Sequence, residues 1–599
     1  MKVIAIDLET TGLNPREDRV RLVQMWDGKE MKILDVFKTP EVLDELLDIC
    51  EDPSITKVFH NAKFDLSFVR VHAQRRVRYS NIFDTLLAEQ VLSAGWSTPY
   101  WDKAANELKK KYPEYSLAKL VSRHLGIRLD KEMQRSNWGS KELTEEQLKY
   151  AAKDVEVLLP IYNIQRNLLE LNNLIPVALL EFNTLGPVIE MELEGLPFSW
   201  SDAEKLREVK LKELEEALTD LKNEARRNQK SRQITLFGED AGVDLNFRSP
   251  SQIVRYITDK LGLPVESSDV ETLRGLDHPF AAKLLRYRTI EKQLNFIEQF
   301  EQFGARTGRL YPTYNQARAA TGRMSSSKFN LQQVPKRGEG RIFRTLFKAV
   351  PGKKLIKSDY SAIEMRVLAK VCNERTMIHA IQTGVDLHRL TASKTVDKPM
   401  DDVTKEERQR AKAVNFGFCF GMGAPTFKRY AWLQYGVKVT EEESIKIREA
   451  YFDLYKDLAT WHIQQKNAMY QNRPYHQHSH GRDIHIEYVA VQQTVLGRKR
   501  WWPNYAGNTT ASPSEYYNSA VQGTASDLLK AALVKLYEVL PAEVHIIAAI
   551  HDEILLESPE DIADQMKDLL VKTMCDVGNN MLSPVPIDAE GTVGDAWGG

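Results

Sequence analysis

Short apolar runs alternate with helical stretches along the first 175 residues. The runs at residues 3–6, 22–25 and 57–59 have the length and apolar character of strands. The stretches between them are typical of helices. This alternation predicts an α/β domain over residues 1–175.

The pattern changes from about residue 182 onward. Residues 202–225 predict one long helix, because leucines recur there at helical spacing among charged residues. Residues 226–243 are polar and aperiodic, which predicts a mobile tip between helices. Further helices follow up to Phe303, and a mixed α/β region starts at Leu355. At about 100 to 200 residues per domain, the 599 residues predict three to five domains.

The composition is that of a soluble globular protein, with 42% hydrophobic and 28% charged residues. No apolar run approaches the roughly 18 residues that a membrane-spanning helix needs. The four cysteines form no CxxC pair, so neither a disulfide framework nor a thiolate zinc site is indicated. The N-terminus predicts a strand rather than a signal peptide, so we expect a cytoplasmic protein without a membrane partner.

Charge is unevenly distributed along a chain whose net charge is only −1. Residues 305–357 contain thirteen lysines and arginines against one acid, Glu339, which gives a local charge of +12. Counterion release favours the binding of phosphate backbones to such a segment, so it indicates a nucleic-acid partner. A solvated charged loop is the alternative interpretation.

Carboxylates gather on the first predicted strand and near two later segments. Asp7 and Glu9 alternate along the strand and therefore share one face. Asp65 follows another apolar strand, and Tyr150 and Asp154 lie one helical turn apart. A single Asp-x-Glu pattern is common on exposed strands, so the hypothesis of a metal site depends on all three segments together. Together they could hold two divalent ions and position a water for phosphoryl displacement.

A second set of acids follows predicted strands far along the chain. Asp359 ends an apolar strand, and Asp552 and Glu553 lie at the turn of a predicted hairpin. Two strand-end aspartates can share two Mg²⁺ ions. Unrelated surface acids would give the same local pattern.

One predicted helix face carries cations first and aromatic rings later. Arg408, Lys412, Phe416 and Phe420 recur every four residues, and each step drifts by about 40° around the helix. Such a face can hold a triphosphate with its cations and a base or sugar with its rings. An amphipathic helix that packs its rings into a core is the alternative. The glycines of this stretch are poor helix formers and indicate a bend or a close neighbour.

The N-terminal fragments resemble the three motifs of DEDD-superfamily 3′–5′ exonucleases, in the branch that carries a tyrosine. The matching segments are DLETTGL at 7–13, NAKFDLSF at 61–68 and YAAKD at 150–154. The resemblance implies that Tyr150 orients the nucleophilic water. It implies four metal ligands: Asp7, Glu9, Asp65 and Asp154. Asp84 also matches a residue of these domains, although a helix-start carboxylate explains it equally well.

From about Glu192 to its end, the chain resembles family A DNA polymerases. The matching motifs, in the order of the family, are TGRMSS at 321–326, NLQ at 330–332, DYSAIEMR at 359–366, RQRAKAVNFGFCFG at 408–421, TVLGRKRWWP at 494–503 and HDE at 551–553. The resemblance fits the large fragment of bacterial DNA polymerase I or a related bacteriophage or viral polymerase. It implies an α/β and α+β multidomain fold, with a ribonuclease H-like exonuclease domain followed by a right-hand polymerase domain.

The polymerase resemblance implies roles for individual residues. Asp359 and Asp552 would hold two Mg²⁺ ions, which Mn²⁺ can replace, beside the auxiliary acid Glu553. Lys412 would protonate the leaving group, and Glu364 would exclude a ribonucleotide 2′-hydroxyl. The residues expected at the nucleotide are Arg408, Lys412, Phe416, Phe420, Glu364, His388, Tyr360 and Ser361. Those expected at the DNA are Arg323, Asn330, Arg498, Asn518, Gln522 and His551.

The resemblance also implies domain boundaries. The exonuclease domain is expected at residues 1–175 and the polymerase domain at 176–599. Within the polymerase domain we expect the thumb at about 190–305 and the fingers at about 373–500. The palm is expected in two segments, at about 306–372 and 501–599.

The chain departs from the family pattern at several positions. Phe420 stands where tyrosine is usual, Ser514 where a minor-groove arginine is common, and Phe329 where a proline usually precedes Asn-Leu-Gln. The change at Phe420 concerns template positioning and fidelity, because a hydroxyl near the templating base is missing. Residues 475–493 look like an insertion, whose histidines at 476, 478, 480 and 485 could bind a transition metal or lie in a solvated loop.

We therefore expect a DNA-directed DNA polymerase with 3′–5′ proofreading, acting on primer-template DNA with deoxynucleoside triphosphates. We expect a monomer associated with the nucleoid. The segment QITLF, from Gln233 to Phe237, resembles the Gln-x-x-Leu-Phe peptide with which bacterial polymerases dock on the sliding clamp. A single-subunit RNA polymerase is an alternative against which Glu364 and the exonuclease motifs argue. Intact Asp359 and Asp552 argue against a non-catalytic nucleic-acid-binding relative.

Overall fold

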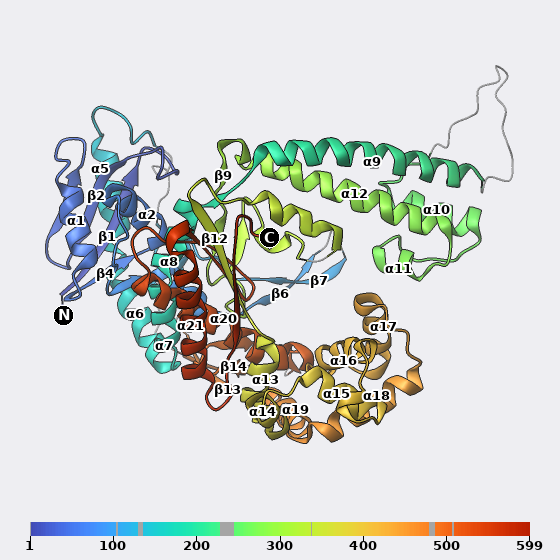
Figure 1. Cartoon of the computed structure of the whole chain (residues 1–599). Coiled ribbons are helices and arrows are strands. Elements are labelled where there is room, and N and C mark those ends of the chain that lie inside the picture. The colour runs from blue at the N-terminus through green and yellow to red at the C-terminus, as the bar shows by residue number, and fades with distance from the viewer. Residues whose placement is uncertain are drawn as a thin grey trace, which may run out of the picture.

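The computed structural model describes residues 2–102, 106–129, 136–227, 245–336, 338–477, 485–505 and 508–598. Figure 1 shows an N-terminal unit, in blue, at one side of the molecule. The rest of the chain forms a central sheet around β12 with two helical arms, one above it and one below it in this view.

The N-terminal unit is built on a five-stranded sheet in the order β3-β2-β1-β4-β5. Its strands are β1 (Lys2–Thr10), β2 (Val20–Trp26), β3 (Met31–Asp35), β4 (Ile55–Phe59) and β5 (Ile82–Asp84). The strands β1, β2 and β3 pair antiparallel, whereas β4 pairs parallel with both β1 and β5. Because parallel strands need crossover connections, helices link them and cover the sheet. The predicted α/β fold class is confirmed, and the three predicted strands lie within β1, β2 and β4.

Among its described residues, this unit has the helices α1 (Val42–Glu51), α2 (Ala62–Ala73), α3 (Thr85–Leu92), α4 (Leu117–Leu125), α5 (Glu145–Glu156) and α6 (Leu158–Leu171). The start of α5 is fixed by a capping box, in which Thr144 and Gln147 each bind the other's backbone N–H. This cap sets the register that brings Asp154 over β1.

Asp84 acts as a double cap at the end of β5. Its carboxylate accepts hydrogen bonds from the backbone N–H groups of Leu86 and Leu87 in α3. It also accepts from the N–H groups of Asn61 and Ala62, at 3.0 and 2.9 Å, where α2 begins. The structure therefore supports the helix-start explanation of this residue.

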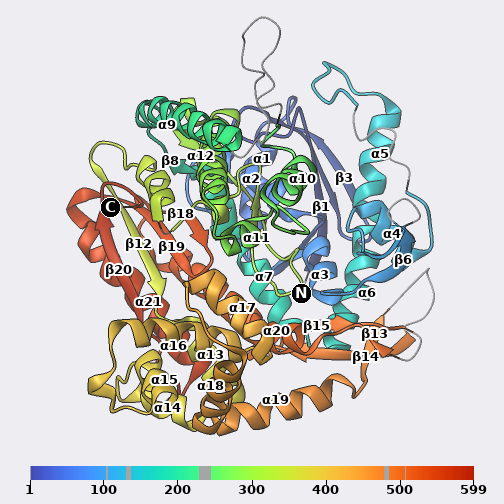
Figure 2. The same cartoon turned by 90° about the vertical axis from the view of Figure 1, so that its right-hand side faces the viewer.

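One helical arm consists of two long helices that lie side by side, α9 (Trp200–Arg227) and α12 (Pro279–Gln302) (Figures 1 and 2). The short helices α10 (Pro250–Leu261) and α11 (Val270–Gly275) complete its outer end, and α7 (Ile175–Asn183) and α8 (Leu185–Glu194) join the arm to the N-terminal unit. The long helix predicted at residues 202–225 is confirmed within α9. The QITLF segment lies outside the described residues.

The central sheet has the order β18-β19-β12-β20, and its neighbouring strands are antiparallel. Its strands are β12 (Lys353–Tyr360), β18 (His545–Ile550), β19 (Glu553–Pro559) and β20 (Ala589–Gly594). The helices α20 (Pro513–Val539) and α21 (Ala563–Leu582) pack together, and α21 lies against β12 and β20. The predicted hairpin is confirmed, because only His551 and Asp552 separate β18 from β19.

The second arm contains α13 (Ile363–Cys372), α14 (Arg375–Gln382), α15 (Leu387–Val396), α16 (Lys405–Phe418), α17 (Ala424–Tyr435), α18 (Glu441–Leu454) and α19 (Lys456–Met469). The chain then returns through a sheet of β13 (Arg473–Gln477), β14 (His485–Gln493) and β15 (Lys499–Trp502). Tyr475, Val489 and Trp501 of this sheet belong to the hydrophobic core of the N-terminal unit. His476 lies in β13, whereas His478 and His480 are outside the described residues.

Short paired strands occur between these units. They are β6 (Thr98–Asp102) with β7 (Glu107–Lys111), β8 (Leu196–Pro197) with β9 (Arg309–Leu310), β10 (Thr313–Asn315) with β11 (Ser325–Ser327), and β16 (Asn504–Tyr505) with β17 (Asn508–Thr509). Among the described residues, none of the helices is long and apolar enough to cross a membrane.

A buried network of charges joins α7 to α20 and to the segment before β15. Arg498 contacts Glu181 at 2.5 Å and Asp527 at 2.6 Å, and Lys530 contacts Glu181 at 2.5 Å. Lys530 also donates to the carbonyl of Gly322 at 2.7 Å. Burial opposes ionisation of Glu181, but the two cations outweigh it and hold the pKa of that carboxyl below its usual value.

Replacing Glu181 with Ala should destabilise the protein strongly, because it leaves Arg498 and Lys530 buried with one acid between them. Breaking a buried ion pair in this way costs about 3–5 kcal/mol. Chemical denaturation should show the loss as a lower unfolding midpoint. Glu216→Ala on the exposed side of α9 is the matched control, and an equal midpoint for both variants would contradict the prediction.

The basic stretch at residues 305–357 is largely neutralised within the protein. Twelve of its thirteen cations lie in the described part of the chain, and eight of these form ion pairs with acids: Arg306, Arg309, Arg323, Lys336, Arg344, Lys348, Lys353 and Lys354. Arg309 and Lys353, for example, both pair with the buried Glu557. Much of the local charge therefore supports the central sheet, which reduces the part that is free to attract phosphates.

Candidate active sites

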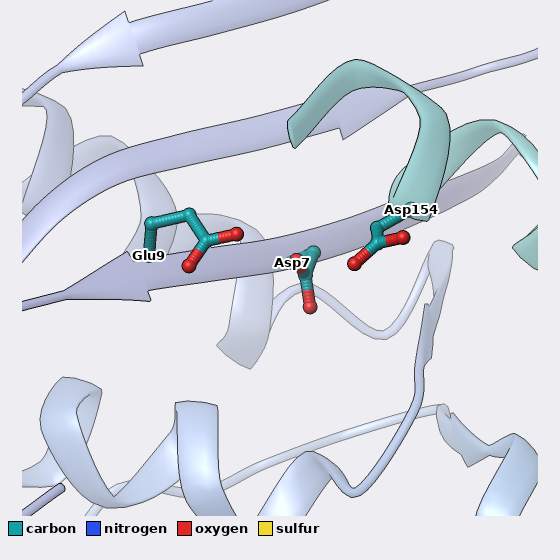
Figure 3. A group of neighbouring side chains, drawn as sticks. All are labelled: Asp7, Glu9 and Asp154. Atoms are coloured by element: carbon teal, nitrogen blue, oxygen red, sulfur yellow. The ribbon is translucent and has the colours of Figure 1, made fainter. Parts of the chain in front are cut away.

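Three carboxylates of the N-terminal unit point toward one another (Figure 3). Asp7 and Glu9 project from the same face of β1, as the period of two predicts, and Asp154 reaches them from α5. Each residue offers a carboxylate oxygen, and these oxygens all lie within 4.8 Å of one another. They line a cavity of about 760 Å³ together with Asp65 and Tyr150.

Asp65 and Tyr150 extend this group. Asp65 is buried in the first turn of α2, close enough to Asp7 for its pKa to be raised well above the usual value, first by burial and then by that charge. The Tyr150 hydroxyl donates to the Asp154 carboxylate, and burial with this neighbouring charge raises the pKa of the phenol. The structure thus brings all five predicted residues to one cavity.

Burial and mutual repulsion disfavour negative charge in this cavity. They raise the pKa of Asp7 to about 8 and that of Glu9 to about 9. Such a set of hard oxygen ligands favours a divalent cation, which would stabilise the ionised carboxylates. The donor chemistry therefore fits a metal site.

These raised pKa values predict how stability depends on pH when metal is chelated. The folded chain holds protons on Asp7 and Glu9 that the unfolded chain loses near pH 4, so stability should fall as the pH rises toward 8–9. Thermal unfolding in EDTA should show this fall, and Mg²⁺ should stabilise the protein more at pH 9 than at pH 6. Asp7→Asn should remove much of the dependence. An unchanged pH profile in this variant would contradict the assignment.

Asp359 and Asp552 lie at the same end of the central sheet, where β12 ends and β19 begins. Asp359 lies near the end of β12, opposite Glu553 in β19, and the backbone N–H of Tyr360 donates to the Asp552 carbonyl at 3.3 Å. Burial raises the pKa of Asp552, the charge of Asp359 adds to this shift, and Lys336 opposes it. The two carboxylates therefore share one electrostatic environment.

Lys336 is a residue of this site that sequence reasoning missed. Its ammonium group lies 2.6 Å from an Asp359 oxygen and 3.8 Å from a Glu553 oxygen. It belongs to the basic stretch, but no periodic pattern distinguishes it from the other cations there. Only the tertiary fold places it beside the aspartates.

Glu553 is turned toward the C-terminal end of the chain. Its buried carboxylate accepts from the Arg344 guanidinium at 3.3 Å and from the Trp597 indole N–H. The Arg344 guanidinium also lies over the Trp597 ring, at 4.0 Å from its centre. These contacts hold Glu553 in place beside β12.

The predicted cationic and aromatic face is present on α16, but it is shorter than expected. Arg408, Lys412 and Phe416 lie on the helix, whereas Phe420 lies beyond its end at Phe418. The helix stops because Gly421 adopts a positive φ of 77°, and a Cβ there would come within 2.8 Å of the Tyr517 ring. The prediction of a single face through Phe420 was therefore wrong, and a bend follows instead.

Two expected nucleotide-binding residues on α15 and α16 have partners in the protein. Arg408 is held by Asp386, at 2.5 Å. The Asn415 amide donates to Nδ1 of His388 at 2.7 Å, and burial lowers the pKa of that imidazole to about 4. His388 is thus a neutral ring, and its centre lies 5.9 Å from that of the Phe416 ring, at a tilt of 46°.

The structure places two further candidates away from any open surface. Tyr360 is buried under the sheet, and its hydroxyl donates to the Met574 carbonyl at 3.2 Å. Arg498 is 4% exposed and belongs to the buried charge network with Glu181 and Asp527. Neither side chain can contact a nucleotide or DNA directly, because each is enclosed and already paired.

The other candidates lie nearer the surface. Arg323 and Glu364 form an ion pair at 2.8 Å, which links two predicted roles. Asn330 caps a 3₁₀ turn, where its side chain accepts from the Gln332 N–H at 3.1 Å. His551 is exposed in the β18–β19 turn with a left-handed φ of 59°. Ser361, Asn518 and Gln522 are half-buried.

The two units thus pair an acid-lined nuclease-like cavity with a second acidic site on a separate antiparallel sheet. Residues 213–599 match DNA polymerase family A, and residues 1–170 match a 3′-5′ exonuclease family. The chain belongs to DNA polymerase family A and carries a 3′–5′ exonuclease domain. Domains of both families are generally metal-dependent.

Individual relatives agree with this membership. The chain is 31% identical to DNA polymerase I of Aquifex aeolicus, over 99% of this chain and 95% of that protein. The chain is also 28% identical to DNA polymerase I of Pseudomonas aeruginosa. This match covers 100% of the chain but only 63% of that longer protein. Its fold is similar to that of the POL domain of Pol1 from M. smegmatis, with a TM-score of 0.77 and 23% identity over 99% of this chain and 95% of that one. The predicted activity, DNA-directed DNA synthesis with proofreading, is confirmed.

Proposed function

We propose that the chain extends primers at the central-sheet site and removes 3′-terminal nucleotides at the N-terminal site, with two Mg²⁺ ions at each. The observation that carries this proposal is that carboxylates converge at two places, on β1 and at the meeting of β12 with the β18–β19 turn. When bound, Mg²⁺ lowers the pKa of a coordinated water or hydroxyl and neutralises charge on phosphoryl oxygens.

At the N-terminal site, the ligands we propose are Asp7, Glu9, Asp65 and Asp154. Tyr150 would orient the attacking water, which its hydrogen bond to Asp154 supports by fixing the position of the phenol. Water and substrate would enter through the cavity of about 760 Å³ that these residues line.

At the central-sheet site, we propose Asp359 and Asp552 as metal ligands, with Glu553 holding the hairpin in place. Lys412 is the cation on α16 best placed to bind the triphosphate and protonate the leaving group, since Arg408 must first exchange Asp386 for a phosphate. His388 would donate or accept a hydrogen bond as a neutral ring. Phe416 would lie under the sugar.

For DNA and sugar recognition, we propose roles for Glu364 and for residues near the β18–β19 turn. Glu364, held by Arg323, would occupy the space of a ribonucleotide 2′-hydroxyl. Arg323, Asn518, Gln522 and His551 would contact the minor groove, whose acceptors are nearly independent of sequence. Phe420 would contact the nucleotide from the turn after α16, and Ser361 from the end of β12.

We further propose residues 1–175 as the exonuclease domain, with the thumb at about 190–305 and the palm around the central sheet. The fingers would contain α14 to α19, while β13–β15 attach to the exonuclease core. We propose a monomer that works in the cytoplasm with the nucleoid, and its bacterial relatives support the cytoplasmic location. Docking on a sliding clamp through Gln233 to Phe237 stays a proposal, since that segment lies outside the described residues.

An end-labelled primer annealed to a longer template tests the proposal. With Mg²⁺ and deoxynucleotides, the label should move to longer products; with Mg²⁺ alone, it should move to shorter ones. EDTA should stop both changes. Lengthening without any shortening would contradict the proposed exonuclease site, and shortening without lengthening would contradict the proposed polymerase site.

A further inference from the structure

The hairpin of β6 and β7 exposes aromatic rings on the N-terminal unit. Its two strands pair with each other and, within the described part of the chain, with no other strand. Tyr100 is 45% exposed, Trp101 is 56% exposed, and Tyr112, just after β7, is 60% exposed. Large exposed rings that are grouped in this way mark an interaction site rather than a packing surface.

Lysines alternate with these rings across the hairpin. Tyr100 lies opposite Lys109 and Thr98 opposite Lys111, so one face carries this ring together with two lysines. The other face carries Trp101 and Lys110. Lys109 is paired with Asp102 at 2.6 Å, whereas Lys110 and Lys111 are exposed and form no ion pair among the described residues.

The segment after this hairpin lines a groove that adjoins the exonuclease cavity. The end of β7 leads into a second cavity, of about 720 Å³, whose wall includes Tyr112 and the exposed Arg318. Asn61, Leu86 and Ser116 line both this cavity and the one that holds Asp7. A strand could therefore lie along one continuous surface from the hairpin to the carboxylates.

We propose that the β6–β7 hairpin and this groove bind single-stranded DNA and lead its 3′ end to the exonuclease site. The inference rests on the proposed exonuclease function and adds a binding surface to it. Bases would stack on Trp101 and Tyr112, and phosphates would meet Lys110, which shares the face of Trp101. This combination of rings and cations binds unpaired strands with little sequence preference, because stacking needs an exposed base face.

Fluorescence anisotropy with a labelled oligothymidylate in EDTA tests the proposal without catalysis. In the whole chain, Trp101→Ala/Tyr112→Ala should weaken single-strand binding about 25-fold or more, since each stacked base contributes about fivefold or more. Lys110→Ser/Lys111→Ser should weaken it at low salt and reduce its salt dependence. Affinity for a blunt duplex should stay within about twofold of the parent. Tyr470→Ala, at a ring that is 63% exposed just after α19, is the matched control.

Unchanged single-strand affinity in both variants would overturn the proposal, as would an equal loss of duplex binding. The lysine variant alters exposed side chains only, so it decides the question if the aromatic variant unfolds. Digestion of the same oligonucleotide by the parent with Mg²⁺ is measured in parallel. Failure of that digestion would contradict the proposed exonuclease function, whereas loss of binding in EDTA would still locate the single-strand surface.

Discussion

Replacing Asp552 with Asn should reduce primer extension by about 1,000-fold and leave 3′ digestion at the parental rate. The carboxylate lies in the β18–β19 turn beside Asp359, and the variant would remove one of the two acids that define this site. Losing a metal ligand removes several kcal/mol of transition-state stabilisation, and each 1.36 kcal/mol changes the rate tenfold. Steady-state extension of an end-labelled primer measures the effect.

Asp561→Asn is the matched control for this variant, since Asp561 is an exposed acid just after β19. It should extend primers at the parental rate. Extension by Asp552→Asn within about tenfold of the parent would contradict the site assignment. A parallel loss of digestion would show that the variant damages the fold rather than one site.

Replacing Asp7 with Asn should have the converse effect, with digestion reduced by about 1,000-fold and extension retained. Asp7 lies between Glu9 and Asp154 in the cluster of Figure 3, so its loss leaves too few carboxylates to hold two ions. The two activities should separate because the two acid sets lie on different sheets. Release of labelled nucleotide from single-stranded DNA measures the effect.

Asp48→Asn, at an exposed position on α1, is the control for the second variant. It should digest DNA at the parental rate. Retained digestion by Asp7→Asn would contradict the assignment of the nuclease centre. Lost extension in the same variant would contradict the independence of the two sites.

Local periodicity was sufficient to predict much of the exonuclease site. Alternation along one strand places Asp7 and Glu9 on the same face, and a separation of one helical turn joins Tyr150 to Asp154. The hairpin around Asp552 follows in the same way from β-branched residues on either side of a polar turn. These features depend on neighbours in the sequence, which is why they could be predicted.

The environment of other residues depended on distant parts of the chain. Arg498 is buried because Glu181, 317 residues away, provides its partner, and no sequence pattern joins them. Lys336 reaches Asp359 only when the segment before β12 folds back over the sheet. The end of α16 could have been predicted from the sequence. Gly421 is a helix-stop signal, and this signal outweighs the helical spacing of Phe420.

Correction of a terminal mismatch tests most directly whether one chain combines both activities. A labelled primer with a mismatched 3′ nucleotide is extended with all four deoxynucleotides, and the products are sequenced. The parent should yield full-length product with the mismatch replaced, while Asp7→Asn should yield little product or product that keeps the mismatch. Full-length parental product that keeps the mismatch would contradict the account.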